Sequence, residues 1–183
     1  YDEKNEFFVI YHWLGGPGTG AVMGRDGLDL IGNLPTLGAL TIPNLEHYEQ
    51  DYPVHFIRQE IRKDGGGPGK WRGGTSVDYE VYIKSSISCS TRGESCRTVT
   101  SFGLNKGKPG SIAKVLYKEN GKSKWTTLPQ YKNIDLPPGN LKIVGAGGGG
   151  FGNPYQRPVK TVLEDVENGV ISIKSALVDY GVS

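Results

Sequence analysis

The sequence is poor in cysteine, methionine and long apolar runs. It has 2 Cys and 1 Met among 183 residues, and hydrophobic residues make up 36% of it. No apolar run approaches the length of a bilayer-spanning helix, so we expect no membrane segment. Cys89 and Cys96 have no histidine nearby and cannot complete a structural zinc site. They favour two free thiols in a reducing cytoplasm over a hairpin disulfide.

Neither sign of charge predominates in the sequence. The net charge is +2, and Lys and Arg are scattered along the chain, which gives no support to a nucleic-acid surface. The acidic opening Tyr1–Glu6 is unlike a signal peptide, and without an initiator Met the chain is expected to be a processed or excised piece. Neither a Ser-His-Asp arrangement nor a Gly-x-Ser-x-Gly elbow is visible, so the residues alone name no reaction.

Glycine, by contrast, is abundant, and it gathers in two clusters. The chain has 28 Gly and 11 Pro, and the clusters span residues 64–74 and 145–154. Glycine loses the most backbone entropy on folding, so such runs are expected where positive φ or close approach of another chain or ligand requires them. Both clusters adjoin strand-like sequence, which predicts shaped loops in a folded body.

Periodicity then places the elements. Val77, Tyr79, Val81 and Ile83 alternate with polar residues and predict a half-buried strand. Further strands are predicted at residues 54–62, 97–102, 113–118, 124–127 and 141–144, with Asn120-Gly121 as a hairpin turn. A short helix is predicted near residues 46–50. Two more helices are expected, over residues 159–166 and after the capping Ser172, with stops at Gly169 and Gly181.

Strands first and helices last predict an α+β fold, mainly β, with Gly-rich loops and a C-terminal helical hairpin. We expect a single domain over residues 1–183. Its β-rich body would occupy residues 1–157 and the hairpin residues 158–183.

The glycine clusters invite comparison with known phosphate motifs. Gly145-x-Gly147-x-x-Gly150 matches a dinucleotide fingerprint formally, but Pro154 prevents the helix that must open within it. One interpretation is a looser anion-binding nest, in which successive glycine amides and a cation hold an anion. The candidate substrate- or anion-binding residues are Gly65, Gly66, Gly67, Lys70, Arg72, Gly147, Gly148, Gly149, Gly150 and His12. The alternative is a tight turn with Lys70 and Arg72 solvated and Trp71 packed on the sheet.

The remaining polar residues carry weaker signals. The three histidines lack metal-ligand spacing, and a structural role is favoured for each. Asp26 and Asp29 are interpreted most simply as turn residues.

The order of the motifs resembles one family. It runs through Asp26-Gly27, Pro43-Asn44-Leu45-Glu46, the 64–74 cluster, Gly103-Leu104, the 147–154 loop, Arg157, Asp165-Val166-x-x-Gly169 and Tyr180-Gly181-Val182. This order is similar to the C-terminal third of the hydantoinase B/oxoprolinase B family, which includes acetone and acetophenone carboxylase subunits. The first turn, residues 11–21, departs from the simpler Gly-Gly-x-Gly-Ala of relatives.

The resemblance implies a hetero-oligomeric complex in which a hydantoinase A-type subunit uses ATP to phosphorylate an amide or enol oxygen. The B-type part then completes cyclic amide hydrolysis or, alternatively, ketone carboxylation. ATP, Mg²⁺ and a divalent metal are expected elsewhere in the complex, on the A-type partner and on the N-terminal part of the hydantoinase B-type protein, with none bound by this chain alone. A third hypothesis is a non-catalytic assembly domain.

Overall fold

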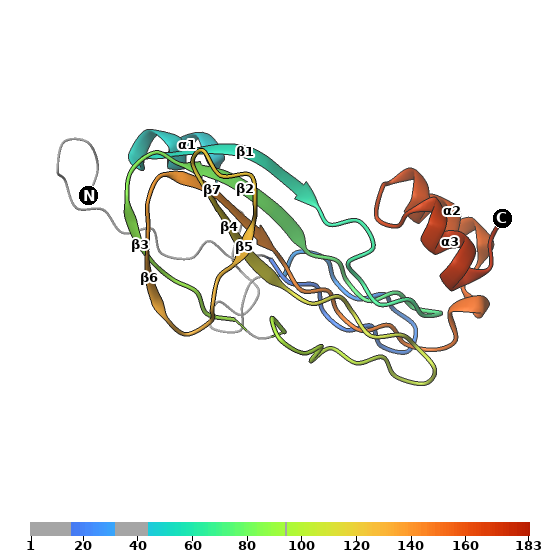
Figure 1. Cartoon of the computed structure of the whole chain (residues 1–183). Coiled ribbons are helices and arrows are strands. Elements are labelled where there is room, and N and C mark those ends of the chain that lie inside the picture. The colour runs from blue at the N-terminus through green and yellow to red at the C-terminus, as the bar shows by residue number, and fades with distance from the viewer. Residues whose placement is uncertain (1–15, 32–43, 94) are drawn as a thin grey trace.

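The computed structural model describes residues 16–31, 44–93 and 95–183. Within them a β-sheet continues into a bundle of extended segments, and two helices stand at the far end of that bundle (Figure 1). The elements in chain order are α1 (Leu45–Asp51), β1 (Val54–Ile61), β2 (Val77–Ile83), β3 (Ile87–Ser90), β4 (Lys114–Glu119), β5 (Thr126–Thr127), β6 (Asn133–Leu136), β7 (Gly139–Val144), the 3₁₀ turn η2 (Pro154–Gln156), α2 (Val159–Glu167) and α3 (Ile173–Tyr180).

The main sheet has the order β1-β2-β7-β4-β5, and its pairs are antiparallel. In β2 the odd-numbered residues are buried and the even-numbered ones half-buried, as strand periodicity requires. A second, two-stranded sheet pairs β3 with β6. The hydrophobic core joins the two sheets, and its buried members are Val54, Val81, Ile83, Tyr117, Leu128, Leu136 and Leu141.

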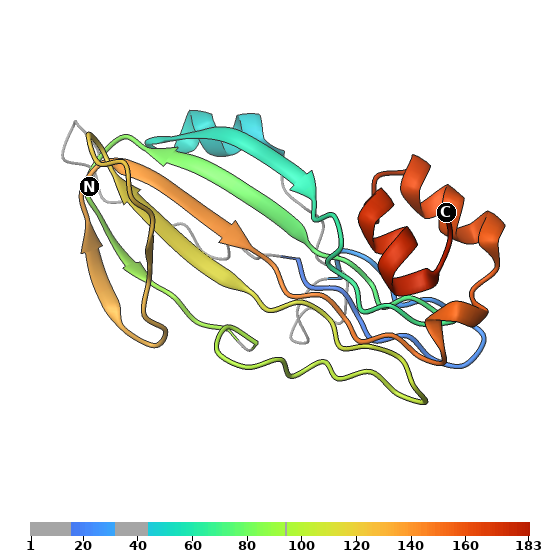
Figure 2. The same cartoon turned by 45° about the vertical axis from the view of Figure 1, so that its right-hand side comes forward.

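Beyond the sheet, extended segments run side by side toward the helices, and both views show this arrangement (Figures 1 and 2). The segment formed by residues 145–151 hydrogen-bonds in several directions. The amides of Gly147, Gly148 and Gly150 donate to Ser111, Gly74 and Lys108 carbonyl oxygens at 3.1, 2.9 and 2.9 Å, and its carbonyl oxygens accept from Gly18, Gly67, Ala21 and Leu104 amides. A β-strand bonds to neighbours on two sides only, so this region is a bundle and not a sheet.

The bundle explains the glycine clusters. A Cβ atom added to Gly66, Gly73, Gly147 or Gly148 would lie within 3.0 Å of the backbone of a neighbouring segment. Only glycine fits such an approach, as it alone fits the crowded axis of the collagen triple helix. We define the glycine bundle as residues 16–30, 64–76, 101–111 and 145–151.

The C-terminal helices form a hairpin with a small core of its own. Val162, Ile171, Ala176 and Tyr180 are its buried members. The Ser172 side chain accepts from the Ser175 amide at 3.0 Å and caps α3, while Gly181 ends it at φ +70°. Among the described residues, no helix has the length and apolar character needed to cross a membrane.

Most element predictions are confirmed. The α+β class, the strands near residues 54–62, 77–83, 113–118 and 141–144, the short helix and the capped hairpin helices all occur. The 124–127 strand is shorter than predicted, at Thr126–Thr127. The predicted strand at residues 97–102 is wrong, because Ser101 and Leu104 bond to Gly110 and Gly150 and so belong to the glycine bundle. Two short strands, β3 and β6, were not predicted.

The Gly148→Ala variant tests the bundle. Its Cβ would collide with the Thr19 carbonyl, so we expect a loss of about 3 kcal/mol or more in unfolding free energy, at the upper end of overpacking costs. Urea denaturation followed by circular dichroism measures it. Gly20→Ala is the matched control, because its Cβ would meet nothing closer than Gly149 O at 3.8 Å. Equal effects of the two substitutions would contradict the close packing.

Candidate functional site

A cluster of paired charged side chains lies where the glycine bundle meets the helical hairpin. Two arginines and three aspartates from distant parts of the sequence come together there. We call this the ion cluster, and its members are Asp26, Asp29, Arg72, Arg157 and Asp165.

Arg157 is the centre of the ion cluster. Its side chain is 2% exposed. It donates two parallel hydrogen bonds to Asp26, from Nη1 to Oδ1 at 2.8 Å and from Nη2 to Oδ2 at 2.7 Å. Nη2 also donates to Asp165 Oδ2 on α2 at 2.8 Å, and Nη1 to the Lys70 carbonyl oxygen at 3.2 Å. The fork geometry of guanidinium suits this bidentate contact, which a lysine could not reproduce.

Arg72 provides the second cation. Its side chain is also buried, and its Nη1 donates to the Gly73 carbonyl oxygen at 2.7 Å and to Asp29 Oδ1 at 3.3 Å. Its Nε lies 3.6 Å from Asp165 Oδ1. The aspartates also accept from the main chain, Asp26 Oδ1 from the Arg72 amide at 2.7 Å and Asp29 Oδ1 from the Thr75 amide at 2.6 Å. The ion cluster thus links residues 26–29, residues 72–75 and α2.

The electrostatics follow from this pairing. Burial alone would lower the pKa of Arg157, but the hydrogen bond to Asp26 and the charges of Asp165 and Asp26 raise it above its usual value. Burial would raise the pKa of Asp26, but its bonds to Arg157 and the Arg72 amide hold it below the ordinary value. Arg157 and Asp26 are therefore both charged at neutral pH.

Tyr180 on α3 closes the ion cluster from the hairpin side. It is 4% exposed, and its hydroxyl is buried without a hydrogen-bond partner among the described residues. Burial raises the pKa of this phenol, and the nearby positive charges of Arg157 and Arg72 offset the rise only in part. It is thus a neutral phenol at physiological pH.

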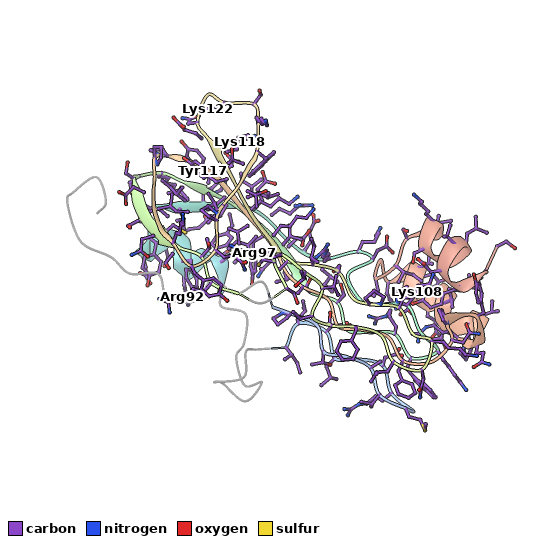
Figure 3. All side chains as sticks on the ribbon, turned by 60° about the horizontal axis from the view of Figure 1, so that its bottom comes forward. Arg92, Arg97, Lys108, Tyr117, Lys118 and Lys122 are labelled. Atoms are coloured by element: carbon purple, nitrogen blue, oxygen red, sulfur yellow. The ribbon has the colours of Figure 1, made fainter. Side chains whose placement is uncertain are left out.

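Two further contacts fix the hairpin to the bundle. Lys108 Nζ lies 2.7 Å from Asp179 Oδ1 of α3, and Figure 3 shows Lys108 beside the helices, at the opposite end from Lys118 and Lys122. Asp64 Oδ1 accepts from the Ser172 amide at 2.7 Å. The hairpin is therefore held at several separate points.

The predicted glycine residues lie together in the bundle, where their amides and carbonyl oxygens form hydrogen bonds with neighbouring segments. The amide of Gly67 donates to Gly148 O at 2.7 Å, and the carbonyl oxygens of Gly65 and Gly149 accept from the Ser111 and Ala21 amides. Gly66 faces the Gly73 backbone. The named amide and carbonyl groups are thus already engaged by the protein itself. Binding by these glycines stays a prediction.

The predicted cations differ in their surroundings. Arg72 is not solvated, as the tight-turn alternative supposed, because the ion cluster encloses it. Lys70 is half-buried, with Nζ 4.9 Å above the Trp71 ring, and Trp71 packs on Phe151 rather than on the sheet. His12 lies outside the described residues. Lys70 is thus the candidate side chain that the ion cluster leaves uncommitted.

Sequence reasoning assigned Asp26 and Asp29 to turns and missed the ion cluster. No periodicity joins Asp26 to Arg157, 131 positions apart. The one sequence signal for this pairing was that Asp26 and Arg157 both occur in the ordered motifs of the family.

The ion cluster does not fit a metal site. Its carboxylates face two guanidinium groups, and within residues 16–31, 44–93 and 95–183 no group of three or more His, Cys, Asp or Glu side chains is placed to hold a metal ion. Its chemistry is that of an electrostatic clamp between the bundle and the hairpin.

Arg157→Ala tests the clamp. Removing one partner leaves Asp26 and Asp165 without their main counter-charge, so we expect a loss of about 3–5 kcal/mol in unfolding free energy. Urea denaturation measures this loss. Arg58→Ala is the control, because Arg58 pairs with the exposed Glu60 at 3.0 Å and its removal should cost less than about 1 kcal/mol. A similarly small loss for Arg157→Ala would refute the clamp.

Acid should weaken the clamp in a defined window. The pKa of Asp26 is lower in the fold than in the unfolded chain, so its stabilisation is complete above about pH 4 and is lost as pH falls through the lower, folded value. The difference in unfolding free energy between wild type and Asp26→Asn should therefore be constant from about pH 7 to pH 5 and shrink below about pH 4. Urea titrations across this range measure it, and a difference that does not change in acid would argue against the assignment.

The chain is similar in sequence to proteins of one family. The family model "Hydantoinase B/oxoprolinase" matches residues 1–154. The chain is 32% identical over 99% of its length to a putative D-/L-hydantoinase B-type subunit of Pseudomonas sp. (strain NS671), and 33% identical over 90% to the beta chain of the caprolactamase of Pseudomonas jessenii. It spans only 30% and 29% of those relatives.

Solved structures agree. The ATP-dependent caprolactamase from Pseudomonas jessenii matches with a TM-score of 0.73 and 29% identity, covering 90% of this chain and 29% of that one. A nucleotide-free acetone carboxylase matches with a TM-score of 0.75 over 91% of this chain and 26% of its own, but at 18% identity it supports the fold alone. Because the family model matches well over half of the chain, the chain belongs to the hydantoinase B/oxoprolinase family.

Proposed function

We propose that this chain is part, or a small subunit, of an ATP-dependent hydantoinase/oxoprolinase-type complex that hydrolyses a cyclic amide. One observation carries the choice. Two relatives, at 32% and 33% identity over 99% and 90% of the chain, have names that refer to hydantoin and caprolactam, both cyclic amides, whereas acetone carboxylase shares only 18% identity. Carboxylation of a ketone is therefore the second candidate.

In this proposal a hydantoinase A-type partner transfers phosphate from ATP to the ring amide oxygen. Water then adds to the activated carbon, and the ring C–N bond breaks as the nitrogen takes up a proton, which leaves an acyl phosphate. A second water hydrolyses the acyl phosphate to a carboxylate and inorganic phosphate, so loss of phosphate drives the reaction. ATP, Mg²⁺ and any divalent metal belong to the partner and to the rest of the hydantoinase B-type protein. This chain alone would be inactive, because the charged groups of its ion cluster pair with one another and the phosphorylating and metal-binding groups belong to the rest of the complex.

Within the complex, the bundle would form a rigid wall of the reaction chamber. Lys70 is the side chain through which it could contact the anionic phosphorylated intermediate. The residue is half-buried, its ammonium lies 4.9 Å from the centre of the Trp71 ring, and it carries no carboxylate partner among the described residues. A positive group held near developing or transferred negative charge stabilises it.

ADP release by the reconstituted complex tests the substrate class. We expect ADP release with hydantoin, 5-oxoproline or caprolactam, and none above background with acetone plus bicarbonate. The opposite result would select the carboxylase alternative.

Lys70→Ala tests the catalytic contribution of the bundle. We expect turnover to fall at least about tenfold, equivalent to about 1.4 kcal/mol, while the complex still assembles. Size-exclusion chromatography and ADP release measure the two properties. Lys160→Ala is the control, since Lys160 is exposed on α2 with only a distant partner, Glu164 at 3.9 Å. Unchanged turnover with Lys70→Ala would favour the non-catalytic assembly hypothesis.

A further inference from the structure

The glycine bundle carries large apolar side chains on its outside. Met23 and Phe102 are 73% and 70% exposed, and Val22 and Leu104 are each about half exposed. Single exposed apolar residues are common on proteins, but a contiguous group marks an interaction site. We call Val22, Met23, Phe102 and Leu104 the apolar patch.

The members of the apolar patch lie on two segments that both contact residues 149–150. The Ala21 amide, next to Val22, donates to Gly149 O at 2.9 Å, and a Cβ on Gly149 would touch the Phe102 carbonyl. The Leu104 amide donates to Gly150 O at 3.0 Å. Both segments that bear the patch therefore meet the same short stretch, Gly149-Gly150.

The backbone holds the apolar patch rigidly. Val22 and Arg25 exchange both of their backbone hydrogen bonds across a turn whose tip is Met23-Gly24, with Gly24 at φ +90°. Leu104 begins a second tight turn, in which its carbonyl oxygen accepts from the Gly107 amide at 2.8 Å. Turn tips normally carry polar residues. An apolar tip on a fixed turn is pre-organised for binding, because little backbone entropy remains to be lost.

We propose that the apolar patch binds the portion of the hydantoinase B-type protein that lies outside residues 1–183, an inference that rests on the proposed function. The relatives are more than three times as long as the part of them that this chain matches, so the greater part of each must pack somewhere beyond it. Met and aromatic side chains are the types enriched in interface cores. Each turn also carries one exposed cation, Arg25 or Lys106, so the occupant is expected to be apolar with an acidic rim.

Met23 is the single methionine in residues 1–183, so its oxidation reports how accessible the apolar patch is. Peroxide converts an accessible methionine to its sulfoxide. In the intact complex we expect Met23 to oxidise at least about tenfold more slowly than in the same sample unfolded in guanidinium, as measured by peptide mass spectrometry. Oxidation within about threefold of the unfolded rate would overturn the proposal.

A photo-crosslinker identifies the occupant. Replacing Phe102 with p-benzoylphenylalanine in the intact complex should give crosslinks to peptides of the hydantoinase B-type protein outside residues 1–183. The same substitution at Tyr131, an aromatic residue 62% exposed, measures background crosslinking. Crosslinks from position 102 to the A-type partner, to a second copy of residues 1–183, or no more than background would each overturn the assignment.

These outcomes are separable from those of the functional assay. A complex that releases ADP with cyclic amides but leaves Met23 open to peroxide would refute the apolar patch and keep the proposed function. A protected Met23 in a complex that is inactive toward cyclic amides would support the apolar patch and refute the proposed function.

Discussion

Close backbone-to-backbone packing of glycine segments is the constraint on which the rest of the molecule depends. Residues 145–151 bond to several surrounding segments at once, and a side chain at most of their glycines would enter a neighbouring backbone. Such packing satisfies buried amides without a sheet. It also fixes the positions from which Asp26, Arg72 and the apolar patch project. The glycine runs are costly in entropy, and this geometry is the physical reason for them.

The ion cluster depends on that scaffold. Two buried guanidinium groups cost much in desolvation, and only several well-placed carboxylates and carbonyls can offset the cost. The bundle supplies Asp26, Asp29 and Arg72 at fixed positions, and the hairpin supplies Asp165 and Tyr180. Arg157, in the connection between them, joins the two parts. Loss of the scaffold would therefore release the hairpin as well.

Sequence periodicity predicted the elements whose stability is local. Strand β2 alternates cleanly, and Ser172 and Gly181 mark the ends of α3, so both were found. Strands β3 and β6 do alternate between apolar and polar residues, but each is only four residues long, and so short an alternation does not distinguish a strand from a loop. The ion cluster and the bundle depend on contacts between distant residues, such as Asp26 with Arg157, and no local pattern contains them. The ordered family motifs contain residues of the ion cluster and of the bundle, but they did not indicate what those residues do.

The most direct measurement is amide hydrogen exchange, followed residue by residue by NMR. In this account the amides of Gly67, Gly148 and Gly150 are bonded inside the bundle. They should therefore exchange as slowly as the Val81 amide in the centre of β2, since exchange requires the structure to open. Exchange of these glycines at the rate of an unstructured peptide, with Val81 still protected, would show that the segments are loose loops and would contradict the account.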